Sequence, residues 1–129
     1  STGLSRFSGA IDHVVTQYHV TGGAPVYAEG SWLLNSGFGM SYTVIFERAT
    51  VDFDSARGAD ALHLLEEGKP VQVIKPEGVD GYVEELRYLV NSIQAGNPPT
   101  VVTAADGLSA VEICEAEERS IQTRSVVEL

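Results

Sequence analysis

The sequence predicts an α+β domain: an open, largely antiparallel β-sheet with two helices packed on one face. Short runs of alternating apolar and polar residues, separated by glycine-rich turns, fill the first half of the chain and indicate strands. Two segments of the second half carry apolar residues at helical spacing. The length of 129 residues suits a single domain over residues 1–129 with one hydrophobic core.

The first predicted strands form a hairpin. Residues 12–20 alternate in character, which places four side chains on one face: Val14, Thr16, Tyr18 and Val20. Gly22-Gly23 can adopt the positive φ angles of a tight turn, and the alternation resumes over residues 26–34. We therefore expect these two strands to pair in antiparallel fashion.

Two further strands are predicted in the middle of the chain. Residues 40–49 alternate and form the third strand. A bend near Thr50 is expected to lead into a short strand that contains Val51 and Phe53.

The segment 60–76 supports two interpretations. Residues 61–67 are good helix formers when taken alone. Gly68-Lys69-Pro70 is typical of a turn, however, and residues 71–74 are rich in strand-forming side chains. Because a hairpin gives both arms a partner, we favour residues 61–66 as its first strand.

A first helix is predicted after a loop at residues 77–81, where Asp80 can act as the N-terminal cap. Its apolar face contains Tyr82, Val83, Leu86, Leu89, Val90 and Ile93. Gly96 is expected to end the helix in the left-handed conformation, and Pro98-Pro99 cannot continue it.

A second helix is predicted to open at a capping box formed by Thr103 and Asp106. Its inner side is expected to carry Leu108, Val111 and Cys114. Four glutamates are assigned to a solvated outer side: Glu112, Glu115, Glu117 and Glu118. Residues 125–129 are short and apolar, which favours a final strand that returns to the sheet.

The charge and cysteine content exclude several classes of protein. A formal net charge of -10, from 8 basic and 18 acidic residues, argues against nucleic acid or an anionic membrane as partner. The chain has neither a signal-like start nor an apolar run of the roughly 18 residues that a spanning helix needs. One cysteine builds no disulfide framework, so we expect a cytoplasmic protein. The opening residues 1–5 contain no initiator methionine, and we expect a piece of a longer protein.

No pattern of residues predicts a catalytic, cofactor or metal site. His13 and His19 are roughly 20 Å apart along a strand and cannot share one ion. Asp12 and His13 face opposite ways on a strand, which excludes an acid–base pair. Cys114 is expected to be a small core residue. The chain also lacks a dinucleotide-binding glycine turn, a Walker loop and a nucleophile elbow.

Aromatic residues on the predicted strands indicate an interaction surface; these are Tyr18, Trp32, Tyr42 and Phe46. Two helices can cover only one face of the sheet, so the other face would expose apolar side chains. We expect homo-oligomerisation through this open face. A strongly curled sheet that covers its own outer face is the alternative.

The order of several motifs is similar to that of a known family. The first helical segment reads Tyr82-x-x-Glu85-Leu86-x-x-Leu89-Val90-x-x-Ile93-x-x-Gly96 and precedes Pro98-Pro99. Later elements are Thr103 to Asp106 with Ala110, Ala116 and Ser120, and the ending Val126-Val127-x-Leu129. With Glu29-Gly30-Ser31-Trp32, they resemble the C-terminal domain of the glucose-fructose oxidoreductase, inositol dehydrogenase and MocA (Gfo/Idh/MocA) family. The resemblance covers the chain from Asp12 onward.

The resemblance implies a substrate-pocket and oligomerisation domain of an NAD(P)-dependent sugar or polyol oxidoreductase, whose N-terminal Rossmann domain binds NAD or NADP. Catalysis in the family relies on a Glu-Lys-Pro motif and on an Asp-x-x-x-His pair. Neither is present, because Lys69-Pro70 follows Gly68 and no aspartate has a histidine four residues later. This chain by itself is therefore expected to hold no cofactor and to be inactive.

The resemblance also implies one substrate-facing residue, Tyr82, because the start of that helix lies near the sugar site in some members of the family. A core-facing tyrosine at a helix start is the alternative for this residue. The rival to an oxidoreductase domain is a stand-alone, non-catalytic α+β module for ligand binding or assembly.

Overall fold

The computed structural model describes residues 1–7, 9–75 and 80–129. The described chain divides into two compact units. One unit combines Ser1–Leu34 with Tyr88–Leu129, and the other is Asn35–Arg87. Each unit contains its own antiparallel sheet, which confirms the α+β class and the open, antiparallel strand arrangement.

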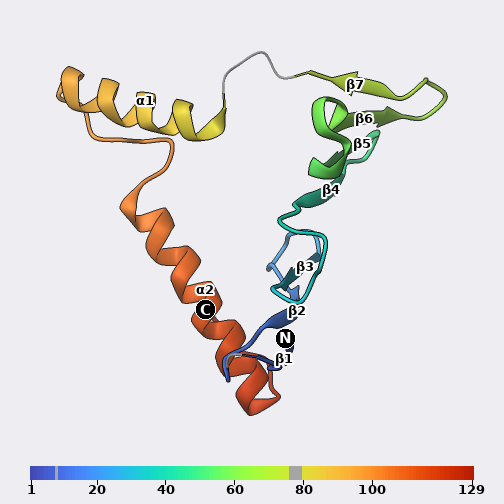
Figure 1. Ribbon diagram of the computed structural model, residues 1–129, viewed down its shortest axis with the longest axis vertical. Helices are drawn as coiled ribbons and strands as arrows, with labels where there is room; N and C mark the ends of the chain where they lie inside the picture. Colours follow the sequence, from blue (N-terminus) through green and yellow to red (C-terminus); the bar gives the residue numbers. More distant parts are fainter. Residues whose placement is uncertain (8, 76–79) are drawn as a thin grey trace. The chain divides into compact units, whose positions relative to one another are not determined.

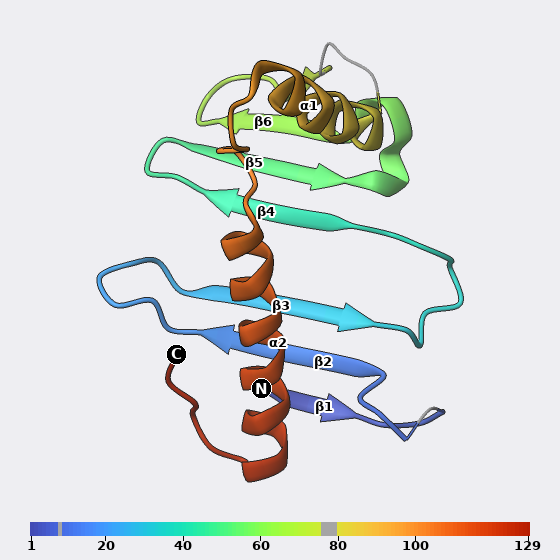
Figure 2. The same ribbon diagram turned by 90° about the vertical axis from the view of Figure 1, so that its left-hand side faces the viewer.

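The first unit contains a three-stranded sheet in the order β1-β2-β3 (Figure 2). Its strands are β1 (Thr2–Leu4), β2 (His13–Tyr18) and β3 (Val26–Ser31). The predicted hairpin is confirmed, because β2 and β3 pair antiparallel and Gly22 has a φ of 71° in the turn. Strand β1 escaped prediction since three residues are too few to show alternation.

Helix α2 (Ala104–Thr123) belongs to the same unit, and its C-terminal part lies beside β1 (Figure 1). The predicted capping box is present: Asp106 N–H donates to Thr103 Oγ1, and Thr103 N–H donates to Asp106 Oδ2. Arg124 then turns the chain with a left-handed φ of 52°.

The expected inner side of this helix is wrong. Leu108, Val111 and Cys114 are all exposed, whereas Ala116 and Ser120 are buried. The physical reason is that small side chains let a helix lie close to a strand. Such side chains contribute little to the apolar pattern from which the inner side was predicted.

The expected final strand at residues 125–129 is also wrong, because these residues lie outside the helices and strands. The Ser120 hydroxyl donates to the Ser125 carbonyl oxygen at 2.8 Å, which ties the start of this segment to α2. A short apolar segment can form either a strand or a loop, and its hydrophobic pattern alone does not distinguish the two.

The second unit contains a four-stranded antiparallel sheet in the order β4-β5-β6-β7. Its strands are β4 (Ser41–Ile45), β5 (Ala49–Asp54), β6 (Leu62–Glu66) and β7 (Gln72–Ile74), with the 3-10 helix η1 (Ser55–Asp60) before β6. The favoured hairpin interpretation of the segment 60–76 is confirmed over its described residues.

The expected bend near Thr50 is wrong. The chain turns earlier, where Phe46 N–H donates to the Ala49 carbonyl oxygen at 2.8 Å, and Thr50 already pairs with Ile45. The polar pair Glu47-Arg48 forms the turn, whereas β-branched Thr50 and Val51 suit the strand.

Helix α1 (Gly81–Ala95) begins as predicted, because Asp80 Oδ1 accepts the Tyr82 N–H at 2.8 Å. Gly96 follows it with a φ of 68°, the left-handed ending expected from the sequence. Of the predicted loop before it, residues 77–79 lie outside the described residues. No helix within the described ranges is both long and apolar enough to cross a membrane.

Candidate functional site

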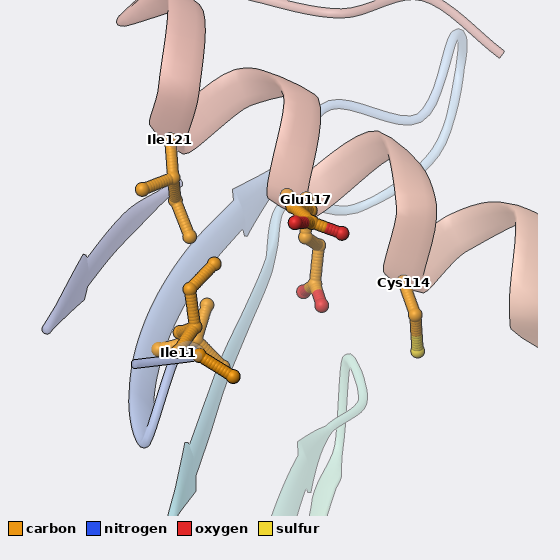
Figure 3. A pocket seen from close by; sticks show the side chains of 7 residues that line it. Ile11, Cys114, Glu117 and Ile121 are labelled. Carbon is orange, nitrogen blue, oxygen red and sulfur yellow. The ribbon is translucent and has the colours of Figure 1, made fainter. Parts of the chain in front are cut away.

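The first unit contains a small hollow between α2 and the start of β2, with a volume of about 280 Å³. Figure 3 shows that Ile11 and Ile121 point toward one another, while Glu117 and Cys114 project from α2 on the same side. The full lining consists of Ala10, Ile11, Val14, Cys114, Glu117, Glu118 and Ile121. The hollow is therefore lined by apolar side chains and by two carboxylates.

The spacing along α2 explains how these side chains reach the sheet. Glu117 lies four residues after Ile113 and four before Ile121, so all three share one helical face. Buried Ala116 and Ser120 lie beside this row and permit the close approach of β1. A side chain on Gly3 would meet Ile121 Cδ1 at 2.7 Å, which shows how closely the two elements pack.

Glu117 is half-buried, and the Tyr18 hydroxyl donates a hydrogen bond to its Oε1 at 2.5 Å. Burial, followed by this hydrogen bond and by the negative charge of Glu117, raises the pKa of Tyr18 to about 12. The assignment of Glu117 to a solvated outer side is therefore wrong. Its carboxylate links β2 to α2, whereas the other three glutamates of that group are exposed.

Replacing Tyr18 by phenylalanine is expected to lower the free energy of unfolding by about 1 kcal/mol, the net value of one hydrogen bond. The native pKa lies above the value near 10 of an unfolded chain, so this stabilisation is complete below about pH 10 and is lost as pH rises through about 12. Urea unfolding of both proteins across this range measures the difference. A difference in the free energy of unfolding between the two proteins that grows with pH would contradict this role of the Tyr18 hydroxyl.

A buried acid, Asp12, follows Ile11 in the chain and binds several backbone groups of the first unit. The Asp12 side chain is 7% exposed, and its Oδ2 accepts the N–H groups of Arg6 at 2.6 Å and Phe7 at 2.7 Å. Its backbone donates to the Leu4 carbonyl and accepts from the Trp32 N–H, both at 2.8 Å. Asp12 thus joins β1, β2 and the residue after β3, which is a structural role.

The lone cysteine lies at the rim of this hollow and is exposed rather than part of a core. A reactive thiolate requires a cationic neighbour or a base such as histidine. The lining around Cys114, as far as the chain is described, offers apolar side chains and two carboxylates. This environment does not favour nucleophilic chemistry.

The histidines and the glutamates of α2 supply further side chains of the types that ligate metals. His13 Nδ1 lies 3.9 Å from Glu29 Oε1 across the sheet, and His19 follows the end of β2. The exposed Glu115 and Glu118 face Arg119 Nη1 at 3.9 Å and Gln122 Nε2 at 3.0 Å. Within residues 1–7, 9–75 and 80–129, no three His, Cys, Asp or Glu side chains are grouped to hold a metal ion.

Tyr82, the candidate substrate-facing residue, lies in the first turn of α1 and is 75% exposed. Its phenol is therefore accessible rather than packed in a core. The hydrogen bond of its N–H to Asp80 fixes the backbone at this point. Contact with a substrate stays a prediction.

The second unit contains a polar cluster on one face of its sheet. Asp52 accepts hydrogen bonds from Thr43 Oγ1 at 2.8 Å and pairs with Arg57 Nη1 at 2.7 Å. The hydrogen bond from Arg57, together with that from Thr43, holds the pKa of Asp52 below its usual range. Arg57 Nη2 also donates to the carbonyl oxygens of Asp52 and Ala61. The cluster anchors η1 on the sheet.

Sequence reasoning missed three of these residues: Asp12 as an acceptor, Glu117 as a bridge, and Arg57 as an anchor. The helical position of Glu117 between two isoleucines was a usable signal, because a charge on an apolar face needs a partner. The partners of Asp12 and Arg57 depend on loop conformation, which no periodicity encodes.

The cluster on the second sheet and the acidic hollow of the first unit are both explained by structural contacts, and neither has the geometry of a catalytic centre. Comparisons of the chain with family models, with curated proteins and with solved structures found no match.

Proposed function

We propose that this chain forms a substrate-pocket wall and an oligomerisation surface of an NAD(P)-dependent sugar or polyol oxidoreductase. The order of its sequence motifs, which resembles the C-terminal domain of the Gfo/Idh/MocA family, supports the proposal. The α+β architecture with open antiparallel sheets is compatible with such a domain. The nicotinamide cofactor and the catalytic lysine would belong to a separate Rossmann domain, and we place the whole protein in the cytoplasm.

The observation that supports the oligomerisation part of the proposal is an apolar face of the four-stranded sheet, which we call the open face. Of the four aromatic residues predicted for such a surface it contains Tyr42, whereas Tyr18 lies in the other sheet and Trp32 and Phe46 lie outside the strands. Pairing registers align Tyr42, Phe53, Leu62 and Ile74 in one row and Val44, Val51 and Leu64 in the next. The rings of Tyr42 and Phe53 are stacked with centroids 5.0 Å apart. Along the edges of this face, Tyr42 is 48% exposed, Val44 43% and Ile74 38%.

The two faces of this sheet have different chemistry. The opposite face carries Thr43, Asp52, His63 and Val73 in one row and Ile45, Thr50 and Leu65 in the next, and η1 is anchored there through Arg57. The open face has seven apolar side chains and only Gln72 as a polar member of the two rows. A sheet with one apolar face needs a covering layer, and a second copy of this chain provides one with matching chemistry.

A substitution on the open face tests self-association. Val44→Glu is expected to convert a dimer into a monomer, because a buried, unpaired carboxylate costs several kcal/mol at an interface of about 800 Å² per partner. Ile45→Glu is the matched control, since Ile45 neighbours Val44 on the same strand, faces the other way and is 80% exposed. Light scattering at high micromolar concentration measures both variants. A monomeric wild type, or equal disruption by Ile45→Glu, would remove the support for the interface.

The proposal that the cofactor site lies in a separate domain has its own test. The 129-residue chain is expected to bind no NAD or NADP in calorimetry, and stoichiometric binding would refute the proposed role. Reading the coding sequence upstream of Ser1 discriminates further. A strand, a glycine-rich turn and a Glu-Lys-Pro motif there would support an oxidoreductase.

The second candidate is a stand-alone module that binds a ligand or assembles with other proteins and performs no chemistry. The open face also favours this reading, because self-association requires no active site. A stop codon or an unrelated domain upstream of Ser1 would favour the module over the oxidoreductase.

A further inference from the structure

A single tyrosine in the middle of α1 connects this helix to the segment that leads into α2. The Tyr88 hydroxyl oxygen accepts the N–H of Thr100 at 2.6 Å and the N–H of Val101 at 3.0 Å. The Thr100 hydroxyl lies 3.5 Å from the same oxygen. Two backbone N–H donors thus converge on one phenolic oxygen beside a third hydroxyl partner, and all of these residues belong to the first unit.

The sequence explains why these particular amides are available. Proline has no N–H, so Pro98 and Pro99 offer no donors, and their fixed φ angles hold the segment extended. Thr100 and Val101 therefore carry the first two N–H groups after the proline pair. Two successive amides that point at one oxygen form an arrangement that stabilises negative charge.

We propose that the Tyr88 hydroxyl is a pH-controlled latch that fastens the corner between α1 and α2. A neutral phenol uses its oxygen as a weak acceptor. Once ionised, the same oxygen is a charged acceptor, and hydrogen bonds to charged groups are about twice as strong as neutral ones. The latch tightens as the phenol loses its proton. This device is independent of the proposed oxidoreductase role.

The electrostatic surroundings set the range in which the latch works. The hydrogen bond from the Thr100 hydroxyl, followed by those from the Thr100 and Val101 N–H groups, lowers the pKa of Tyr88 to about 8. The segment 97–103 contributes no titratable side chain, and the next acid, Asp106, is bound by Thr103. On α1 the preceding turn carries Glu84, which pairs with Arg87, and Glu85.

The sign of the effect follows from these values. The native pKa of Tyr88 lies below the value near 10 of an unfolded chain, so its ionisation stabilises the folded corner. This contribution is absent below about pH 8, develops as pH rises and is complete above about pH 10. The ionised fraction rises from about a tenth at pH 7 to about nine-tenths at pH 9.

Tyrosinate absorbance and amide chemical shifts test the latch in the full chain. We expect one of the 5 tyrosines to ionise near pH 8, and this step to disappear in Tyr88→Phe but not in Tyr27→Phe. The amide protons of Thr100 and Val101 should shift with the same midpoint in the wild type. Absence of the early ionisation, or its survival in Tyr88→Phe, would overturn the proposal.

A second pair of variants keeps the test decisive if Tyr88→Phe fails to fold. Thr100→Val removes the hydroxyl and retains the N–H, whereas Thr100→Pro removes both donors while extending the existing proline pair. The midpoint pH of the Tyr88 ionisation should rise toward 10 in the order wild type, Thr100→Val, Thr100→Pro. Identical midpoints in all three proteins would show that these donors do not control Tyr88.

Discussion

Replacing Asp12 by alanine is expected to lower the free energy of unfolding by about 3 kcal/mol. The Asp12 carboxylate is buried and accepts the N–H groups of Arg6 and Phe7 at 2.6 and 2.7 Å. Hydrogen bonds to a charged acceptor are worth about 1.5–3 kcal/mol each, and alanine leaves both donors unsatisfied. The loss is measurable by urea unfolding followed by circular dichroism.

Two variants separate the carboxylate from other contributions. Asp12→Asn retains an acceptor oxygen without the charge and should lose about half as much stability. Asp60→Ala is the surface control, because Asp60 is 58% exposed and its ion pair with Lys75 is worth less than about 1 kcal/mol. If Asp12→Ala and Asp60→Ala were equally stable, Asp12 would not anchor the sheet.

Replacing Ala116 by leucine is the second substitution with a large expected effect, a loss of about 2 kcal/mol. Ala116 is 7% exposed on the side of α2 that lies beside β1, where the packing is close. Three additional carbons must displace the strand or adopt an unfavourable rotamer. Thermal and urea unfolding both measure this loss.

Ala110→Leu is the matched control, since it makes the same change in the same helix at an exposed position. Leucine and alanine have similar helix propensities, so the control should change stability by less than about 0.5 kcal/mol. Equal losses from the two variants would attribute the effect to the helix itself rather than to its contact with β1.

Local sequence signals predicted the elements that depend on nearest neighbours. The capping box at Thr103, the Asp80 cap and the left-handed Gly96 were all found where the sequence placed them. The β2–β3 and β6–β7 hairpins were predicted as well, because alternation and turn residues lie within a few positions of one another. These features are fixed by backbone sterics and short-range hydrogen bonds.

Contacts between distant residues were not predictable in the same way. The Tyr18–Glu117 hydrogen bond joins residues 99 positions apart, and the outer-side assignment of Glu117 failed for that reason. The expected final strand was also wrong: the Ser120 hydroxyl donates to the Ser125 carbonyl oxygen, a contact that the apolar pattern of residues 125–129 does not encode. Pattern reasoning weighs apolar residues and overlooks a polar side chain whose partner is remote.

The sequence by itself determined the α+β class, the β2–β3 and β6–β7 hairpins and both helix caps, since each depends on the periodicity or conformation of adjacent residues. The tertiary structure alone decided which face of α2 is buried, which groups donate hydrogen bonds to Glu117 and Asp12, and which two backbone N–H groups donate to Tyr88. The physical reason is that packing selects small side chains and buried hydrogen bonds, and these depend on which distant segments meet.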